Sequence, residues 1–303
     1  MNKTIRNLTC VLIIASVVFF AGCAGKEERT TPAQTQVPTP SLTPVSTLTG
    51  HEQAGEPNMS YLGLADVFKG KTGLPVSTTN IDVDIEGVSL SGFLVQPVTP
   101  GKYPGIVMIH EWWGLNDQVK SMADITAREG YVVLAVDLFK GNVATTIEGA
   151  QDNIRNNPNN ETIPKTQAAV KYLRNMTNVN KSKIASLGWC YGGGQSFQLG
   201  INEDLQATVI YYGQVSTDKT ILMKMKQPVL GLYGVEDTSI PVKDVREFER
   251  ILKEQGTSVN ISIYEGAGHA FSNPTNTQAF RKEQAIDAWN KTLEFLELNL
   301  KKN

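Results

Sequence analysis

A cysteine flanked by glycines is the feature of this sequence best suited to chemistry. Cys190 lies in the run Gly-Trp-Cys-Tyr-Gly-Gly-Gly at 188–194, directly after the apolar stretch Ile184–Gly188. The spacing Gly-x-Cys-x-Gly between a strand and a helix is typical of a nucleophile elbow, with cysteine in place of the more frequent serine. Flanking side chains would collide with neighbouring backbone at such a turn, which favours glycine. The pattern predicts a thiol nucleophile at a helix N-terminus, where the N–H of Tyr191 favours a thiolate and a developing oxyanion.

The surroundings of this thiol exclude several other interpretations. The glycine run lacks the Lys-Ser/Thr pair of a phosphate-binding loop. The other two cysteines, Cys10 and Cys23, lie at the N-terminus, so Cys190 has no partner for a disulfide in a processed domain. A redox sensor would need a resolving cysteine that the domain lacks. A functional thiol is therefore favoured over a buried, inert one.

A thiol of ordinary pKa needs a base, and three histidines are present, His51, His110 and His269. His269 lies in Gly-Ala-Gly-His-Ala-Phe at 266–271, after an apolar run. In α/β-hydrolases the chain order is nucleophile, acid, histidine, which His269 satisfies and His110 does not. We expect His269 to be the base.

The acid of such a site lies between the nucleophile and the histidine, just after a strand. The segment Gly-Leu-Tyr-Gly-Val-Glu-Asp at 231–237 fits this place. Glu236 and Asp237 are both candidates, and Asp244 is a third. We favour Asp237 because its short side chain points from the loop toward the place to which the histidine loop must return. The acid would fix the imidazole tautomer and support the imidazolium.

A fourth motif, Ile-His-Glu-Trp-Trp-Gly at 109–114, follows another apolar run, where the second oxyanion donor normally arises. Its carboxylate, Glu111, would face the nucleophile. A zinc site built from His110, Glu111, His269 and Cys190 is conceivable, but no closely spaced ligand pair on one element supports it. We expect no metal and no cofactor.

Short β-branched runs alternate with longer amphipathic stretches from about residue 61 onward. The predicted strands are Ile81–Asp84, Val88–Gln96, Gly105–His110, Tyr131–Asp137, Ile184–Gly188, Ala207–Tyr212, Val229–Gly234 and Val259–Tyr264. The predicted helices are Gln118–Glu129, Pro164–Asn175, Gly192–Ile201, Val242–Gln255 and Thr277–Leu298. Several runs are apolar on both faces, which predicts an α/β fold with a mostly parallel sheet and helices on both faces. The first two runs, separated by Gly87, would form an antiparallel edge.

Three of these motifs resemble the dienelactone hydrolase family (carboxymethylenebutenolidase-like). They are His-Glu-Trp-Trp-Gly-Leu at 110–115, Gly-Trp-Cys-Tyr-Gly-Gly at 188–193 and Gly-His-Ala-Phe at 268–271. The resemblance covers about residues 80–300 and implies the α/β-hydrolase fold. A cysteine elbow with an upstream glutamate is a specific combination within that superfamily.

The resemblance implies a Cys190–Asp237–His269 triad and an oxyanion hole formed by the N–H groups of Tyr191 and Trp112. It also implies that Glu111 hydrogen-bonds the resting thiol and accepts its proton when substrate arrives. The implied reaction is attack on the carbonyl of a small ester or lactone, formation of a thioester acyl-enzyme, and hydrolysis by water. A non-catalytic binding module that reuses the fold is the alternative.

One position departs from the family pattern. Members that open dienelactones hold the substrate carboxylate with arginines, one of them four residues after the histidine, where this chain has Asn273. Asparagine cannot form the bidentate clamp of arginine, so we expect a neutral or different small substrate. Trp112, Trp113, Tyr191 and Phe271 would line an apolar pocket or belong to the core. The substrate-binding candidates are Trp113, Phe271 and Asn273.

The N-terminus predicts export. Lys3 and Arg6 precede the apolar run Leu12–Phe20, and the segment ends in Phe-Ala-Gly-Cys at 20–23. This order is typical of a signal peptide with a lipobox over residues 1–23, in which Cys23 is lipidated. Phe20 stands where leucine is usual, so a secreted protein and an uncleaved anchor are alternatives. Each of these places the domain outside the cytoplasm, and the lipid anchor places it at the outer face of the cell membrane.

Residues 24–58 are rich in Thr, Pro, Ser, Gln and Gly and predict a disordered tether to the membrane. Residues 59–303 form the predicted catalytic domain. Within it, Tyr61–Phe68 predicts either a short helix packed on the domain or a flap over the site. The net charge of −2 and the lack of a basic run exclude a nucleic-acid partner, which leaves a small molecule and the membrane as the expected partners.

Overall fold

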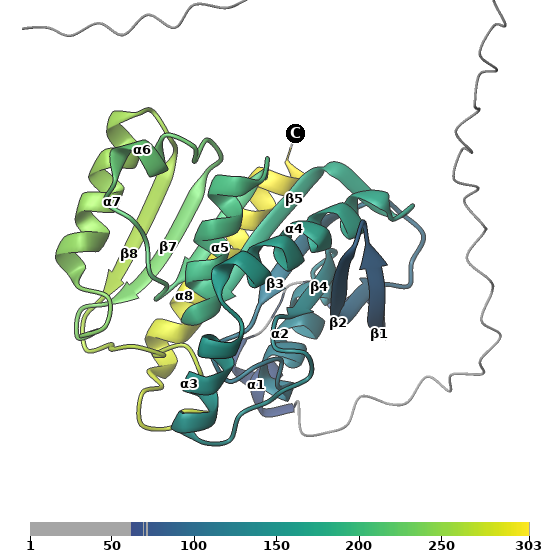
Figure 1. The fold of residues 1–303 in the computed structure, drawn as a ribbon, viewed down its shortest axis with the longest axis horizontal. Coiled ribbons are helices and arrows are strands. Elements are labelled where there is room, and N and C mark those ends of the chain that lie inside the picture. Colours follow the sequence, from purple (N-terminus) through teal and green to yellow (C-terminus); the bar gives the residue numbers. More distant parts are fainter. Residues whose placement is uncertain (1–61, 69, 71, 303) are drawn as a thin grey trace, which may run out of the picture. The chain divides into compact units, whose positions relative to one another are not determined.

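The structure of the catalytic region is a computed structural model that describes residues 62–68, 70 and 72–302. Its centre is an eight-stranded sheet with the strand order β1-β2-β4-β3-β5-β6-β7-β8 (Figure 1). The strands are β1 (Val76–Ile85), β2 (Val88–Pro97), β3 (Tyr103–Ile109), β4 (Val132–Asp137), β5 (Val179–Trp189), β6 (Ala207–Tyr211), β7 (Val229–Gly234) and β8 (Val259–Tyr264).

The sheet is mostly parallel, as the apolar runs predict. The pairs β4–β3, β3–β5, β5–β6, β6–β7 and β7–β8 are parallel, whereas β1–β2 and β2–β4 are antiparallel. The β1–β2 hairpin turns through Glu86 and Gly87, both with positive φ (54° and 85°). Positive φ at both central residues suits the right-handed twist of the two strands. The antiparallel edge is therefore confirmed.

Helices cover the sheet on both faces (Figure 1). They are α1 (Leu62–Val67), α2 (Asp117–Arg128), α3 (Ile147–Asn156), α4 (Asn159–Asn175), α5 (Tyr191–Asn202), α6 (Lys219–Leu222), α7 (Val242–Glu254) and α8 (Lys282–Leu296), which continues into a π-helical turn, Glu297–Lys301. Side chains of α2 and α8 share one core cluster, whereas α4 and α7 contribute to two clusters on the other side of the sheet.

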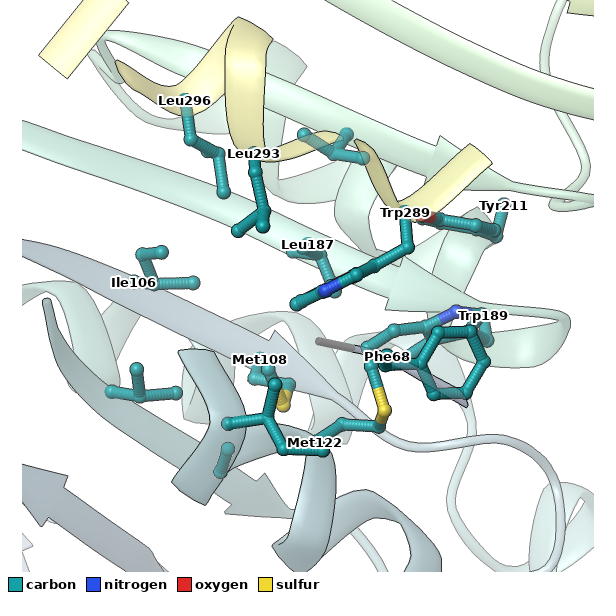
Figure 2. Packing of buried hydrophobic residues seen from close by; sticks show 14 of the residues in the cluster. Phe68, Ile106, Met108, Met122, Leu187, Trp189, Tyr211, Trp289, Leu293 and Leu296 are labelled. Carbon is teal, nitrogen blue, oxygen red and sulfur yellow. The ribbon is translucent and has the colours of Figure 1, made fainter. Parts of the chain in front are cut away.

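Alternation along the central strands produces these separate cores. In β3, Ile106 and Met108 belong to the cluster under α8, while Val107 and Ile109 belong to the cluster under α4. Successive side chains of a strand point to opposite faces, so a run that is apolar throughout requires helices on both. Figure 2 shows Trp289 of α8 above this first face.

The eight predicted strands and five predicted helices are all present, with shifted ends. Helix α4 begins at Asn159, five residues before the predicted start at Pro164, so this proline lies inside the helix. Helix α8 begins at Lys282, after turns that occupy the start of the predicted helix. Helices α3 and α6 are additional. Only Ala150 and Asn153 of α3 are buried, and its two isoleucines, Ile147 and Ile154, are exposed.

The described part of the predicted segment Tyr61–Phe68, from Leu62 onward, adopts the first of the two predicted forms. Helix α1 contacts α2, and Phe68 packs edge-on against Trp289 with ring centroids 6.0 Å apart (Figure 2). The segment is thus a short helix anchored on the domain. Within the described range, no helix is both long and apolar enough to cross a bilayer. The predicted signal peptide, Cys23 and the predicted tether lie outside the described residues.

Candidate active site

The turn between β5 and α5 presents Cys190 in a backbone conformation that side chains rarely adopt. Its φ is 54° and its ψ is −118°, and it lies at the N-cap of α5. The neighbouring glycines allow this turn. A Cβ on Gly188 would lie 2.1 Å from the carbonyl oxygen of Gly192, and a Cβ on Gly192 would lie 2.3 Å from that of Ile109. The glycine spacing in the sequence therefore reflects close contacts of backbone with backbone.

Three side chains from the carboxyl ends of β5, β7 and β8 form one hydrogen-bonded chain. Cys190 Sγ lies 3.1 Å from His269 Nε2, and His269 Nδ1 lies 2.7 Å from Asp237 Oδ2. Asp237 is buried, and its other oxygen, Oδ1, accepts hydrogen bonds from the backbone N–H groups of Ser239 (2.8 Å) and Ile240 (3.0 Å). The acid is thus held by its own loop and oriented toward the imidazole.

The surroundings of His269 favour its protonated form. Burial of the ring opposes the charge, but the hydrogen bonds to Asp237 and Cys190 outweigh burial and raise the pKa of His269. An imidazole in this position can accept the thiol proton and remain charged beside a thiolate.

The hydrogen-bond partners of Glu111 are Asn273 and Tyr212. Its carboxylate is buried; Oε2 accepts a 2.6 Å hydrogen bond from Asn273 Nδ2, and Oε1 accepts a 3.4 Å bond from the Tyr212 hydroxyl. Burial raises the pKa of Glu111, and these two bonds oppose the rise. The thiol of Cys190 binds His269 instead. The resting contact between Glu111 and the thiol, which the resemblance implies, is not formed among the described residues.

Tyr212 is a residue of this site that the sequence patterns did not single out. It follows β6 directly with φ 35° and is fully buried. Its ring lies 5.2 Å from that of His269 and 5.4 Å from that of Phe271, in edge-to-face geometry. Burial raises its pKa well above the ordinary value for tyrosine, so the hydroxyl is a donor. The sequence placed Tyr212 at the carboxyl end of a predicted strand, and this position was the one sequence feature that could have identified it as a residue of the site.

His110 joins the ends of two strands. Its Nδ1 lies 2.6 Å from the carbonyl oxygen of Glu111, and its Nε2 accepts a 3.1 Å hydrogen bond from the N–H of Leu138. Burial lowers the pKa of His110 to about 4, which keeps the ring neutral with Nδ1 as the donor. This histidine therefore positions the backbone of the Glu111 loop. No group of three or more potential metal ligands of the His, Cys, Asp and Glu types occurs in the part of the chain that the structure describes.

A cavity of about 880 Å³ opens at the reactive atoms and is lined by Cys190, His269, Tyr191 and Trp112, among others. Three predicted substrate contacts lie elsewhere. Phe271 is fully buried in the core under α8, and Asn273 is buried against Glu111. Trp113 packs edge-on against Trp112, with ring centroids 5.2 Å apart, and is not among the residues that line the cavity.

Comparisons with known proteins agree with this architecture. The family model described as "Dienelactone hydrolase family" matches residues 90–300. A protein of Saccharolobus solfataricus named "Putative carboxymethylenebutenolidase" is 31% identical over 249 residues, which cover 70% of this chain and 95% of the relative. A protein of Bradyrhizobium named "Probable 2-oxo-3-(5-oxofuran-2-ylidene)propanoate lactonase" is 27% identical, with coverages of 73% and 94%.

Solved structures show the same fold. The dienelactone hydrolase-like promiscuous phosphotriesterase P91 from metagenomic libraries superposes with a TM-score of 0.68 at 19% identity, covering 74% of this chain and 98% of that one. Esterase 2 of Thermogutta terrifontis superposes with a TM-score of 0.58 at 17% identity, covering 75% and 96%. Both likenesses establish the α/β-hydrolase fold. The family-model match over residues 90–300 and the 31% identical relative show that this chain belongs to the dienelactone hydrolase family.

Proposed function

We propose that this protein hydrolyses a small ester or lactone through a Cys190–His269–Asp237 triad and a thioester acyl-enzyme. Its family membership makes it a carboxylic ester or lactone hydrolase and disfavours a non-catalytic binding module. One observation carries the finer proposal. The thiol, imidazole and carboxylate are joined by contacts of 3.1 Å and 2.7 Å, and Cys190 and His269 line a cavity.

In the acylation step, His269 Nε2 accepts the proton of the Cys190 thiol, and the sulfur attacks the carbonyl carbon. The carbonyl π electrons move to oxygen and form a tetrahedral oxyanion. This intermediate collapses to a thioester, and the imidazolium gives its proton to the leaving alkoxide. Asp237 stabilises the imidazolium throughout. In a lactone the alcohol stays attached to the acyl group, so ring opening releases nothing until water completes the second step.

The N–H groups of Tyr191 and Trp112 are the proposed oxyanion donors. Tyr191 is the first residue of α5 and directly follows Cys190, so its N–H has no partner within the helix. Trp112 follows Glu111, whose carbonyl is held by His110. Donors held in advance need no reorganisation when charge develops, which is the basis of this stabilisation.

Water completes the cycle. His269 removes a proton from the water as it attacks the thioester carbonyl, and the thiolate leaves as the acid departs. Glu111 would reach the thiol only after its bonds to Asn273 and Tyr212 break. In our proposal His269 is therefore the proton acceptor in the resting enzyme. The carboxylate of Glu111 interacts electrostatically with His269 and would support its imidazolium form.

Trapping the acyl-enzyme tests this proposal. Rapid acid quenching of the enzyme during turnover of a 4-nitrophenyl ester, followed by intact mass measurement, should show the added acyl mass, and peptide mapping should place it on Cys190. The Cys190→Ala variant should lose both the adduct and the hydrolysis. Hydrolysis that persists in this variant would contradict the mechanism.

We also propose that the enzyme works outside the cytoplasm, on a lipid anchor at Cys23. The support is the N-terminal sequence alone, in which positive residues, an apolar run and Phe-Ala-Gly-Cys follow one another over residues 1–23. Cell fractionation tests this directly. Wild-type protein should sediment with membranes and carry the mass of a lipid on Cys23, and Cys23→Ser protein should lack that mass; membrane-bound wild-type protein without a lipid on Cys23 would exclude the anchor.

A further inference from the structure

The cavity at Cys190 extends far beyond the reactive atoms. Its volume of about 880 Å³ lies in the upper part of the range for ligand pockets, roughly 300–1,000 Å³. Along one side it follows helix α5, where Gly194, Gln198 and Ile201 line it at helical spacing. With a rise of about 1.5 Å per residue, this stripe is roughly 16 Å long from the elbow to Ile201. A small lactone would occupy only the end of the cavity nearest the thiol.

Three further lining residues, from outside α5, are aliphatic. They are Val215 in the loop after β6, Ile221 of α6 and Ile240 in the loop before α7. All three side chains also pack against the core cluster under α7, which holds them in place. A ligand that extends along α5 therefore meets fixed, branched apolar surface over its length.

Charge is sparse in this cavity. Among the lining residues, all of which are described, Lys224 is the single member of the Lys, Arg, Asp and Glu types. It is exposed and follows α6 in the chain. The remaining polar groups are uncharged amides, hydroxyls and the reactive side chains. Beyond the reactive residues, a carboxylate along α5 would lose its hydration and would find Lys224 as its single cationic side chain, which favours an uncharged chain in this part of the cavity.

Gly194 is a glycine that the backbone does not require. Its φ is not positive, and a Cβ there would have as its nearest neighbour the carbonyl oxygen of Gln214, at 3.6 Å, an ordinary contact. In contrast, a Cβ on Gly192 would lie 2.3 Å from backbone. Glycine inside a helix is less stable than alanine, so its presence at 194 has a cost without a steric reason in the fold. Gly194 and Gln214, in the loop after β6, both line the cavity, so the absent methyl group leaves cavity space between α5 and that loop.

We propose that this part of the cavity binds the long apolar chain of an uncharged ester, and that Gly194 is a specificity-determining residue that keeps it open. The inference rests on the proposed function, because Cys190 and His269 line the same cavity. It goes further by naming the substrate class, an aliphatic ester larger than a small lactone. The chain belongs either to the acyl group or to the alcohol, and both share the same apolar chemistry.

Two homologous ester series test the proposal on the full-length chain. In 4-nitrophenyl alkanoates from acetate to dodecanoate, the chain is on the acyl side; in alkyl acetates of matched length, it is on the alcohol side. Each methylene that leaves water favours binding, so kcat/KM should rise by up to roughly fourfold per added methylene in one series until the cavity is filled. If kcat/KM stays flat or falls with chain length in both series, while the acetates are hydrolysed in a Cys190-dependent reaction, the proposed binding of a long chain is wrong. The proposed hydrolase mechanism would be unaffected by that result.

Three variants locate the effect. Gly194→Ala and Ile221→Asn should each lower the ratio of kcat/KM for the decanoate to that for the acetate at least fivefold. The matched control is Met223→Asn, because Met223 is an exposed apolar residue beside α6 that does not line the cavity. This variant should keep the wild-type ratio. Equal ratios in all four proteins would remove Gly194 and Ile221 from the binding surface.

A binding measurement separates this inference from the catalytic one. 2-Dodecanone is uncharged, has a long chain and contains no ester, and Cys190→Ala protein cannot add to its carbonyl. Calorimetric titration into Cys190→Ala protein should show binding that is at least fivefold weaker after the further change Ile221→Asn and unchanged after Met223→Asn. If 2-dodecanone does not bind, the proposed binding of a long chain is wrong, whether or not esters are hydrolysed. If it binds but no ester is hydrolysed by the wild type, only the proposed catalysis is contradicted.

Discussion

Asn273 donates a 2.6 Å hydrogen bond to Glu111, a residue 162 positions earlier in the chain. Both side chains are buried, at 3% exposure each. The sequence alone suggested Asn273 as a contact for the substrate, in the place of a family arginine. In the structure it holds a buried carboxylate instead. Any influence of Asn273 on substrate is therefore exerted through Glu111.

Replacing Asn273 should disturb Glu111. In Asn273→Ala, the buried carboxylate loses its shorter hydrogen bond, so the free energy of unfolding should fall by about 1–3 kcal/mol. Because this bond lowers the pKa of Glu111, its loss should raise that pKa and move the acidic limb of the kcat/KM–pH profile to higher pH. Urea unfolding and a pH–rate profile measure the two effects.

Thr275→Val is the matched control for that variant. It removes the 2.7 Å hydrogen bond from the exposed Thr275 hydroxyl to Asn273 Oδ1 but leaves the bond to Glu111 intact. Its pH–rate profile should match that of the wild type. If both variants shift the profile equally, the Asn273–Glu111 bond is not the cause.

Asp237 and its neighbour Glu236 offer a direct test of the catalytic acid. Asp237→Asn keeps the shape of the side chain but cannot stabilise an imidazolium, so kcat should fall by roughly 10³–10⁴-fold. Glu236 is exposed, and Glu236→Gln should stay within about twofold of the wild type. Steady-state hydrolysis of a 4-nitrophenyl ester measures both. A large loss in Glu236→Gln with activity retained in Asp237→Asn would reverse the assignment.

The elbow glycines should differ sharply in their tolerance of a methyl group. In Gly192→Ala, the new Cβ would lie 2.3 Å and 2.4 Å from the carbonyl oxygens of Ile109 and His110. The backbone must shift, so we expect about 3 kcal/mol or more of lost stability. Gly194→Ala has room and should be neutral or stabilising by up to about 1 kcal/mol. Thermal unfolding of both variants measures the difference. Similar losses of stability in Gly192→Ala and Gly194→Ala would show that the backbone around Gly192 can shift to accept a methyl group.

His110 should make the fold sensitive to acid. Its pKa is lowered from 6.5 to about 4 in the folded state, so between these values the unfolded chain binds more protons. Stability from this group is complete above pH 6.5 and is lost as the pH falls toward 4. The loss amounts to about 3 kcal/mol, from a shift of about 2.5 pH units at 1.36 kcal/mol each.

The variant His110→Asn isolates this contribution. Its amide can replace Nδ1 as donor to the carbonyl of Glu111 but does not titrate. Chemical unfolding at intervals from pH 7 to pH 4 should show a shallower decline for this variant than for the wild type. Asp137 and Lys165 lie near the ring, and their charges act in opposite directions on its pKa. Parallel declines in the two proteins would assign the acid sensitivity elsewhere.

Local pattern was sufficient for much of the fold. Runs such as Tyr131–Asp137 are apolar on both faces. A strand that is covered on both faces needs apolar residues at nearly every position, so such a run predicts burial on both sides. Helix α3 was not predicted: Ile147, Ala150 and Ile154 share one helical face, but they are three apolar residues in an otherwise polar stretch of ten. The start of α4 was also missed, since Pro164 suggests a first turn and the actual helix accommodates it further in.

The sequence by itself determined the reactive residue types and their order, because a nucleophile elbow depends on contacts within a few residues of Cys190. It also determined the family. Only the tertiary structure decided the partners of Glu111, because Asn273 and Tyr212 reach it from loops more than 100 residues away. Hydrogen bonds across such separations depend on how strands are ordered in the sheet and how their ends turn. Spacing along one chain does not contain that geometry.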